Sequence, residues 1–143
     1  MGQAETYVTL RITKPGVSAD GVTAKLGIEP THSHDVGDQK PRGTPYRHMM
    51  WSLSTKSQGY GPLSEHLATL LDRVEPKRAV LVEMAADRFE MDRFCFVSVE
   101  GNGGVVLQVD LLRRLAALPV VDRRPWAFVS AAVLVDGCCG RPE

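Results

Sequence analysis

The sequence predicts an α+β domain in which helices pack on one face of a mixed or mostly antiparallel sheet of about five to six strands, a loosely ferredoxin-like outline. Two observations support this fold class. Segments in which apolar and polar residues alternate, typical of half-buried strands, are interspersed with segments whose apolar residues recur at helical spacing. Several links between neighbouring segments are short and rich in Gly or Pro, as in hairpin connections between antiparallel strands.

Alternation identifies the expected strands. In the first of them, Val8, Leu10 and Ile12 share one face. The segment 88–100 has apolar residues on both faces, which favours a central strand for part of its length. The predicted strands cover residues 7–12, 49–54, 88–100, 105–109 and 126–135, with a further short strand near residues 35–37.

Helices are expected where apolar residues recur three or four positions apart. Ser18 is a good N-cap for the first helix, and Gly27 can adopt the left-handed conformation that ends it. The strongest helical pattern runs over residues 63–74, and Pro76 should end or kink it because proline removes a backbone donor. The predicted helices cover residues 19–26, 63–74, 77–86 and 111–118.

Composition and charge limit the function classes. The 143 residues predict a single α+β domain over residues 1–135 and a polar C-terminal tail over residues 136–143. Lys plus Arg and Asp plus Glu both number 17, so the chain lacks the basic character of a nucleic-acid-binding protein. There is no apolar run long enough for a membrane span and no signal peptide pattern, so we expect a cytoplasmic protein with no membrane partner.

Three short motifs resemble a known family. The run Leu26 to Thr31, then Gly37-Asp38, then Trp51-Ser52-Leu53-Ser54 is similar to the bacterial domain-of-unknown-function family numbered four-two-seven-nine. The resemblance covers residues 7–135 and implies a small bacterial α+β domain without an agreed activity, so no catalytic residue is carried over. The family usually closes on an acidic, aromatic-ended strand, whereas residues 126–135 are nearly uncharged here, which leaves the register of the last strand open.

The long polar segment 29–48 is the most informative region for function. It is rich in Pro, Gly, Asp, His and Arg, and loops of this length inside compact domains tend to be functional or mobile. A tryptophan on an alternating strand is most often a core residue. The alternative is that it forms the floor of a binding pocket. The candidate ligand-binding residues are Trp51 as the floor and His34, Asp38, Arg42 and Tyr46 as the rim.

The same segment contains the residue types that bind metals. His32, His34 and Asp35 could ligate a transition metal, with Asp38 close by, because imidazole and carboxylate groups suit zinc and related ions. A third well-placed ligand would have to come from elsewhere, from His48 or His66. The competing interpretation is a hydrated loop whose polar side chains make local turn hydrogen bonds. We therefore predict no cofactor and keep these residues as weak metal candidates only.

The leading functional hypothesis is a non-enzymatic binding or interaction module that recognises an unknown protein partner or small ligand, in one version an immunity or antitoxin-like protein. It depends on the zero net charge, the polar loop beside an aromatic strand, and the lack of a complete catalytic motif. The alternative is a small metal-dependent or general-base enzyme that uses His32, His34, Asp35 and Asp38. No nucleophile elbow of the Gly-x-Ser-x-Gly type is present.

Overall fold

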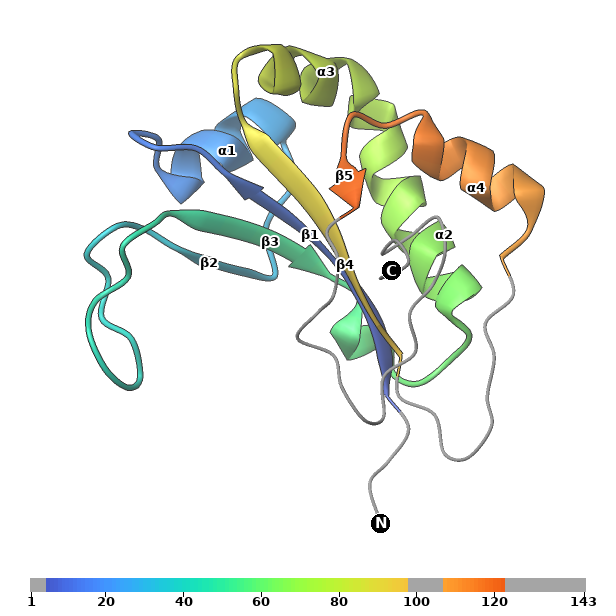
Figure 1. Ribbon diagram of the computed structural model, residues 1–143, viewed down its shortest axis with the longest axis horizontal. Coiled ribbons are helices and arrows are strands. Elements are labelled where there is room, and N and C mark those ends of the chain that lie inside the picture. The colour runs from blue at the N-terminus through green and yellow to red at the C-terminus, as the bar shows by residue number, and fades with distance from the viewer. Residues whose placement is uncertain (1–4, 98–106, 123–143) are drawn as a thin grey trace, which may run out of the picture.

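The computed structural model describes residues 5–97 and 107–122 of the chain (Figure 1). β1 (Thr6–Thr13) lies inside the sheet and pairs antiparallel with β3 (Met50–Ser54) and with β4 (Glu90–Val97). β2 (His32–His34) is antiparallel to β3 at one edge, and the two-residue β5 (Val121–Asp122) is parallel to β4 at the other. The strand order is therefore β2-β3-β1-β4-β5.

The expected α+β class is confirmed, and the four strands from β2 to β4 form the antiparallel part of the sheet. The total of five to six strands stays a prediction, because the strand expected at 126–135 lies outside the described residues. The expected C-terminal tail, residues 136–143, lies outside them as well.

One face of the sheet carries the hydrophobic core. Val8, Leu10 and Ile12 of β1 are each 1% exposed or less, as their alternation predicts. Between and after them, Arg11 and Thr13 are half-buried and point to the opposite face, which we call the open face. The helices lie together on one side of the sheet in Figure 1, and their buried residues pack on this core face. Among the polar residues of the strands, Arg93 of β4 is an exception, because it pairs with Leu10, is 3% exposed and donates to the Leu115 carbonyl at 3.3 Å on the core face.

The first helix, α1 (Ala19–Leu26), begins and ends where local signals predict. The Ser18 side chain accepts a hydrogen bond from the Gly21 backbone N–H at 3.1 Å, which satisfies a donor left free in the first turn. Gly27 has a φ of 69°, the left-handed conformation that glycine adopts without a steric penalty. Both predicted caps are confirmed.

The second helix, α2 (Leu63–Val74), has the predicted bounds and buries its apolar stripe against the sheet. Pro76 lies in a short 3₁₀ turn (Glu75–Lys77) that joins α2 to α3 (Arg78–Ala86). The α-helical pattern therefore ends at the predicted place, and the chain turns into α3 with no intervening loop.

Two strand predictions are wrong. The short strand expected near residues 35–37 is instead β2 at residues 32–34, and a turn follows it. In the segment 105–109, residues 107–108 have no regular structure and Val109 begins α4 (Val109–Ala116); residues 105–106 lie outside the described residues. Three alternating apolar residues are a weak strand signal, and leucines at helical spacing after Val109 override it by packing on the core.

A buried polar network joins α2 to the end of β3. His66 of α2 is fully buried, with Nδ1 2.6 Å from Thr55 Oγ1 and Nε2 3.0 Å from the Gly59 carbonyl oxygen. Because a carbonyl only accepts, Nε2 carries a proton, and in the neutral ring Nδ1 then accepts from the Thr55 hydroxyl. Thr55 Oγ1 in turn accepts from the Val8 backbone N–H at 3.0 Å. His66 is a structural residue and does not reach the polar loop.

Candidate functional site

The long polar segment forms a hairpin between β2 and β3, and we call residues 35–49 the hairpin loop. In Figure 1 it lies on the side of the molecule away from α2 and α4. Tyr46 closes its base, because the Gly37 N–H donates to the Tyr46 carbonyl at 2.8 Å and the Tyr46 N–H donates to the Asp38 carbonyl at 2.9 Å. Gly37 has a φ of 88°, a conformation that favours glycine. The described loop is thus hydrogen-bonded at its base and exposed at its tip.

The two aspartates of the loop have structural partners. The Asp38 carboxylate accepts from the Asp35 backbone N–H at 2.8 Å and so stabilises the turn after β2. The Asp35 carboxylate accepts from the Ala19 backbone N–H at 2.8 Å, where the positive end of the α1 dipole favours a negative charge. Asp35 therefore attaches the hairpin loop to the start of α1.

No group of three or more His, Cys, Asp or Glu side chains is placed to hold a metal ion within residues 5–97 and 107–122. The His32 and His34 rings are 6.1 Å apart, centroid to centroid. Neither His48 nor His66 joins them in such a group. β2 thus brings His32 and His34 near each other, but among the described residues neither Asp35 nor another His, Cys, Asp or Glu completes a group of three.

His34 and Tyr46 are the rim residues that the fold brings into contact. Their rings stack with centroids 3.5 Å apart and an interplanar angle of 10°, and Lys40 lies over the Tyr46 ring at 5.2 Å. The His34 Nδ1 atom is buried and has no hydrogen-bond partner among the described residues. Burial first and the neighbouring His32 second lower the pKa of His34 below its usual value near 6.5. The neutral ring is therefore favoured in the folded protein.

The other predicted residues are placed differently. Asp38 is exposed at the loop base, and Arg42 is exposed at the loop tip. Trp51 is 0% exposed, and its Nε1–H donates to Thr23 Oγ1 of α1 at 3.0 Å. Because successive strand residues point to opposite faces, Trp51 lies under α1 while its neighbour Met50 faces the open side. We correct the pocket-floor hypothesis accordingly: Trp51 belongs to the core and is separated from the other four residues.

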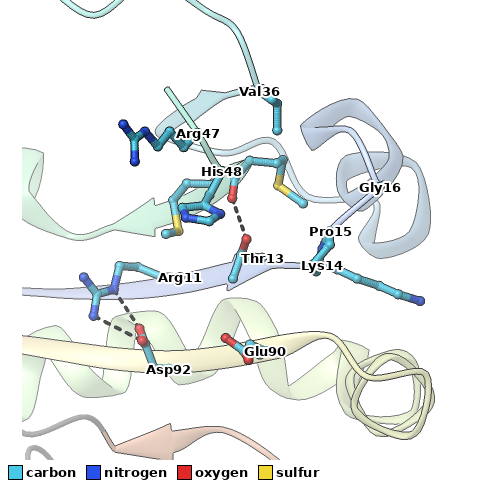
Figure 2. Close-up of a pocket in the computed structure, with 12 residues that line it drawn as sticks. Arg11, Thr13, Lys14, Pro15, Gly16, Val36, Arg47, His48, Glu90 and Asp92 are labelled. Atoms are coloured by element: carbon cyan, nitrogen blue, oxygen red, sulfur yellow. Dashed lines mark hydrogen bonds and ion pairs between the residues drawn. The ribbon is translucent and has the colours of Figure 1, made fainter. Parts of the chain in front are cut away.

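A pocket of about 570 Å³ lies at the base of the hairpin loop (Figure 2). The end of β1 and the turn after it form one wall, and the hairpin loop with the start of β3 forms the other. Carboxylates of β4 complete the lining. Its residues are Arg11, residues 13–16, Val36, residues 47–50, Glu90 and Asp92.

The cations of this pocket differ in their partners. Arg11 makes a two-point ion pair with Asp92, through Nε at 2.7 Å and Nη2 at 3.1 Å. Lys14 is 3.1 Å from an Asp87 carboxylate oxygen. Arg47 is exposed and makes no hydrogen bond or ion pair with the described residues. Arg47 is thus a cation on the pocket wall that remains available to a ligand.

Sequence reasoning missed the β1 and β4 side of this pocket. The alternation in residues 7–12 was a usable signal, because it places Arg11 on the face opposite to Val8 and Leu10. The partner of Arg11 was not predictable in the same way. Asp92 is separated from Arg11 by 81 positions in the sequence, and the two become neighbours only through the pairing of β1 with β4.

Comparison with known proteins gives one match. A family model described as a domain of unknown function (DUF4279) matches residues 4–121. No curated protein matches the chain, and no solved structure does. Among the described residues, no helix is long and apolar enough to cross a membrane.

Proposed function

The chain belongs to the DUF4279 family, and we propose that it is a non-enzymatic binding module whose ligand-binding surface is the pocket at the base of the hairpin loop. The observation that carries the proposal is the pocket itself. Its volume of about 570 Å³ falls in the range of roughly 300–1,000 Å³ that small-molecule sites occupy. Met50, Val36 and Pro15 supply apolar lining, and a few charged groups lie beside them, which is the usual composition of such sites.

The rim residues of the hairpin loop support the same proposal. His34 and Tyr46 do not line the pocket themselves, but His34 pairs with the lining residue Met50 across β2 and β3 and stacks on Tyr46, next to the lining residue Arg47 in the chain. Arg42 at the loop tip extends the surface that a larger partner would meet. A ligand in the pocket would therefore contact the loop that the sequence marks as functional.

The partner is a small ligand or another protein. The protein version is an immunity or antitoxin-like role in the bacterial cytoplasm, and analogy with other small α+β domains is its support. The mostly exposed stretch 39–48 favours an acidic partner surface, because it contains the exposed Arg42 and Arg47 and the half-buried Lys40 and no carboxylate.

Site-specific photo-crosslinking in the native host tests the proposal for either kind of partner. A photo-reactive residue at position 36 replaces Val36, which is 63% exposed and lines the pocket. The matched control replaces Val82 of α3, which is 45% exposed and does not line the pocket. We expect a defined adduct at position 36, small or macromolecular by intact mass, that the control lacks. No adduct, or the same adducts at both positions, would contradict the pocket as a binding site.

The alternative is a small metal-dependent or general-base enzyme using His32, His34, Asp35 and Asp38. Its support is weaker, since both carboxylates already accept backbone hydrogen bonds. Elemental analysis of the purified protein, with a His34→Ala variant as control, tests it. A stoichiometric transition metal that the variant loses would favour the enzyme, whereas equal metal content in both proteins would remove its basis.

We also infer that the antiparallel core of the sheet is a ferredoxin-like arrangement. The order β2-β3-β1-β4 supports this. In the unit β1-α1-β2 the two strands are not neighbours, and β3 lies between them; in the unit β3-α2-α3-β4 the strand between them is β1. An experimental structure would test the inference through the pairing of β1 with both β3 and β4.

A further inference from the structure

The cations around the pocket fall into two groups. Arg11 lies over the Phe94 ring at 5.3 Å in addition to its ion pair with Asp92. Lys14 lies over the Phe89 ring at 4.9 Å in addition to its ion pair with Asp87. Each of these two cations is thus held by one carboxylate and one aromatic ring. Arg47 has neither kind of partner among the described residues.

Arg47 places its positive charge toward one end of the pocket. In Figure 2 the side chains of Arg47 and Arg11 lie toward one end of the pocket, and Lys14 lies toward the other. Apolar groups of Val36 and Met50 lie on the same wall as Arg47. A ligand with an apolar body beside these residues would bring an acidic group to a guanidinium, which binds planar carboxylates through two parallel hydrogen bonds.

The carboxylates of the pocket limit the charge of the ligand. Asp92 and Glu90 line it as well, and both repel an anion. With one available guanidinium and two nearby carboxylates, a singly charged group is favoured over a doubly charged phosphate monoester. Both carboxylates already interact with other groups of the protein, Asp92 with Arg11 among them, so their repulsion is reduced but not removed.

We propose that this pocket binds an apolar monocarboxylate and that Arg47 is the group that recognises the acid. The inference rests on the proposed function and narrows it to a class of ligand. A small organic acid and the free C-terminus of a peptide share this chemistry, and the experiment distinguishes them.

The test is an NMR titration of ¹⁵N-labelled protein with matched probes. The first pair is 4-phenylbutyrate and the uncharged 4-phenylbutanol, and the second is N-acetyl-Ala-Phe with a free or an amidated C-terminus. We expect the acids to shift the backbone signals of Thr13, Lys14 and Met50 and to bind about tenfold more tightly than the uncharged forms, the effect of one charge-assisted hydrogen bond. The acid with the lower Kd shows whether the pocket prefers a small organic acid or the free C-terminus of a peptide.

Two variants with the same change of charge complete the experiment. Arg47→Gln should bring the acids to the affinity of their uncharged counterparts, whereas Arg73→Gln, on the exposed surface of α2 and outside the pocket lining, should leave them unchanged. Equal affinities of acid and uncharged probe, absence of binding by all four probes, or tighter binding of phenyl phosphate than of phenylbutyrate would overturn the proposal. A crosslink at position 36 that persists in Arg47→Gln would preserve the proposed function while the acid specificity fails.

Discussion

Two histidines, one in the core and one beside the hairpin loop, differ in how their ring nitrogens are hydrogen-bonded. His66, on the buried face of α2, has a partner for each ring nitrogen, at 2.6 Å and 3.0 Å. His34, on the open face, has a buried Nδ1 without a partner among the described residues. Buried polar groups in proteins are normally hydrogen-bonded, so the satisfied histidine serves the fold and the unsatisfied one marks a region with unused bonding capacity. Changes in the two regions should therefore have different consequences.

The largest expected effect comes from the core tryptophan. Trp51→Ala should lower the free energy of unfolding by about 3–5 kcal/mol, because it removes a fully buried ring and leaves a cavity. Tyr46→Ala removes an aromatic ring from the half-buried loop base and should cost clearly less. Urea denaturation followed by circular dichroism measures both. If the two variants lose equal stability, the contrast between core and hairpin loop is wrong.

The histidines provide the most direct version of the comparison. His66→Ala leaves the Thr55 hydroxyl and the Gly59 carbonyl without their partner and should cost about 1–3 kcal/mol beyond the lost packing. His34→Ala leaves no partner of its Nδ1 atom behind, because that atom has none among the described residues, and should cost less, mainly the stacking with Tyr46. Chemical denaturation at neutral pH compares the two. A greater loss in His34→Ala would reverse the assignment of roles.

A smaller effect tests the link between the hairpin loop and α1. Asp35→Ala removes the acceptor of the Ala19 N–H and should destabilise the protein by about 1 kcal/mol, as the loss of a helix cap does. Asp35→Asn keeps an oxygen acceptor and should restore part of this stability. Amide hydrogen exchange at Ala19 should quicken in the alanine variant. Unchanged exchange would show that Asp35 does not support the start of α1.

The smallest expected effect is a dependence on pH. The folded protein lowers the pKa of His34, mainly by burial, so below pH 6.5 the unfolded chain takes up the proton more readily than the folded one. The stability of the folded protein therefore falls as the pH drops through the pKa that His34 has in the unfolded chain. At higher pH the histidine is neutral in both states and does not change the stability. Between about pH 7.5 and pH 5, the wild type should lose more stability than His34→Gln. An equal loss in both proteins would contradict the proposed burial of this ring.

Much of the fold was predictable because its signals are local. The bounds of α1 follow from Ser18 and Gly27 at its ends, and those of α2 follow from the leucine stripe. The candidate site was predictable only as a segment. The loop composition pointed to residues 29–48, but the placement of Trp51 under α1 depended on which face of β3 the helix covers.

The sequence by itself determined where the helices capped by local signals begin and end and which strand residues face the core, since caps and alternation act between near neighbours. Only the tertiary structure decided that Arg11 meets Asp92, that Asp35 reaches the start of α1, and that Arg47 borders a pocket. These contacts join residues far apart in the chain, and strand pairing sets their geometry. For this reason the candidate site could be identified only in the folded structure, whereas most of the helices and strands that form it could be predicted from the sequence.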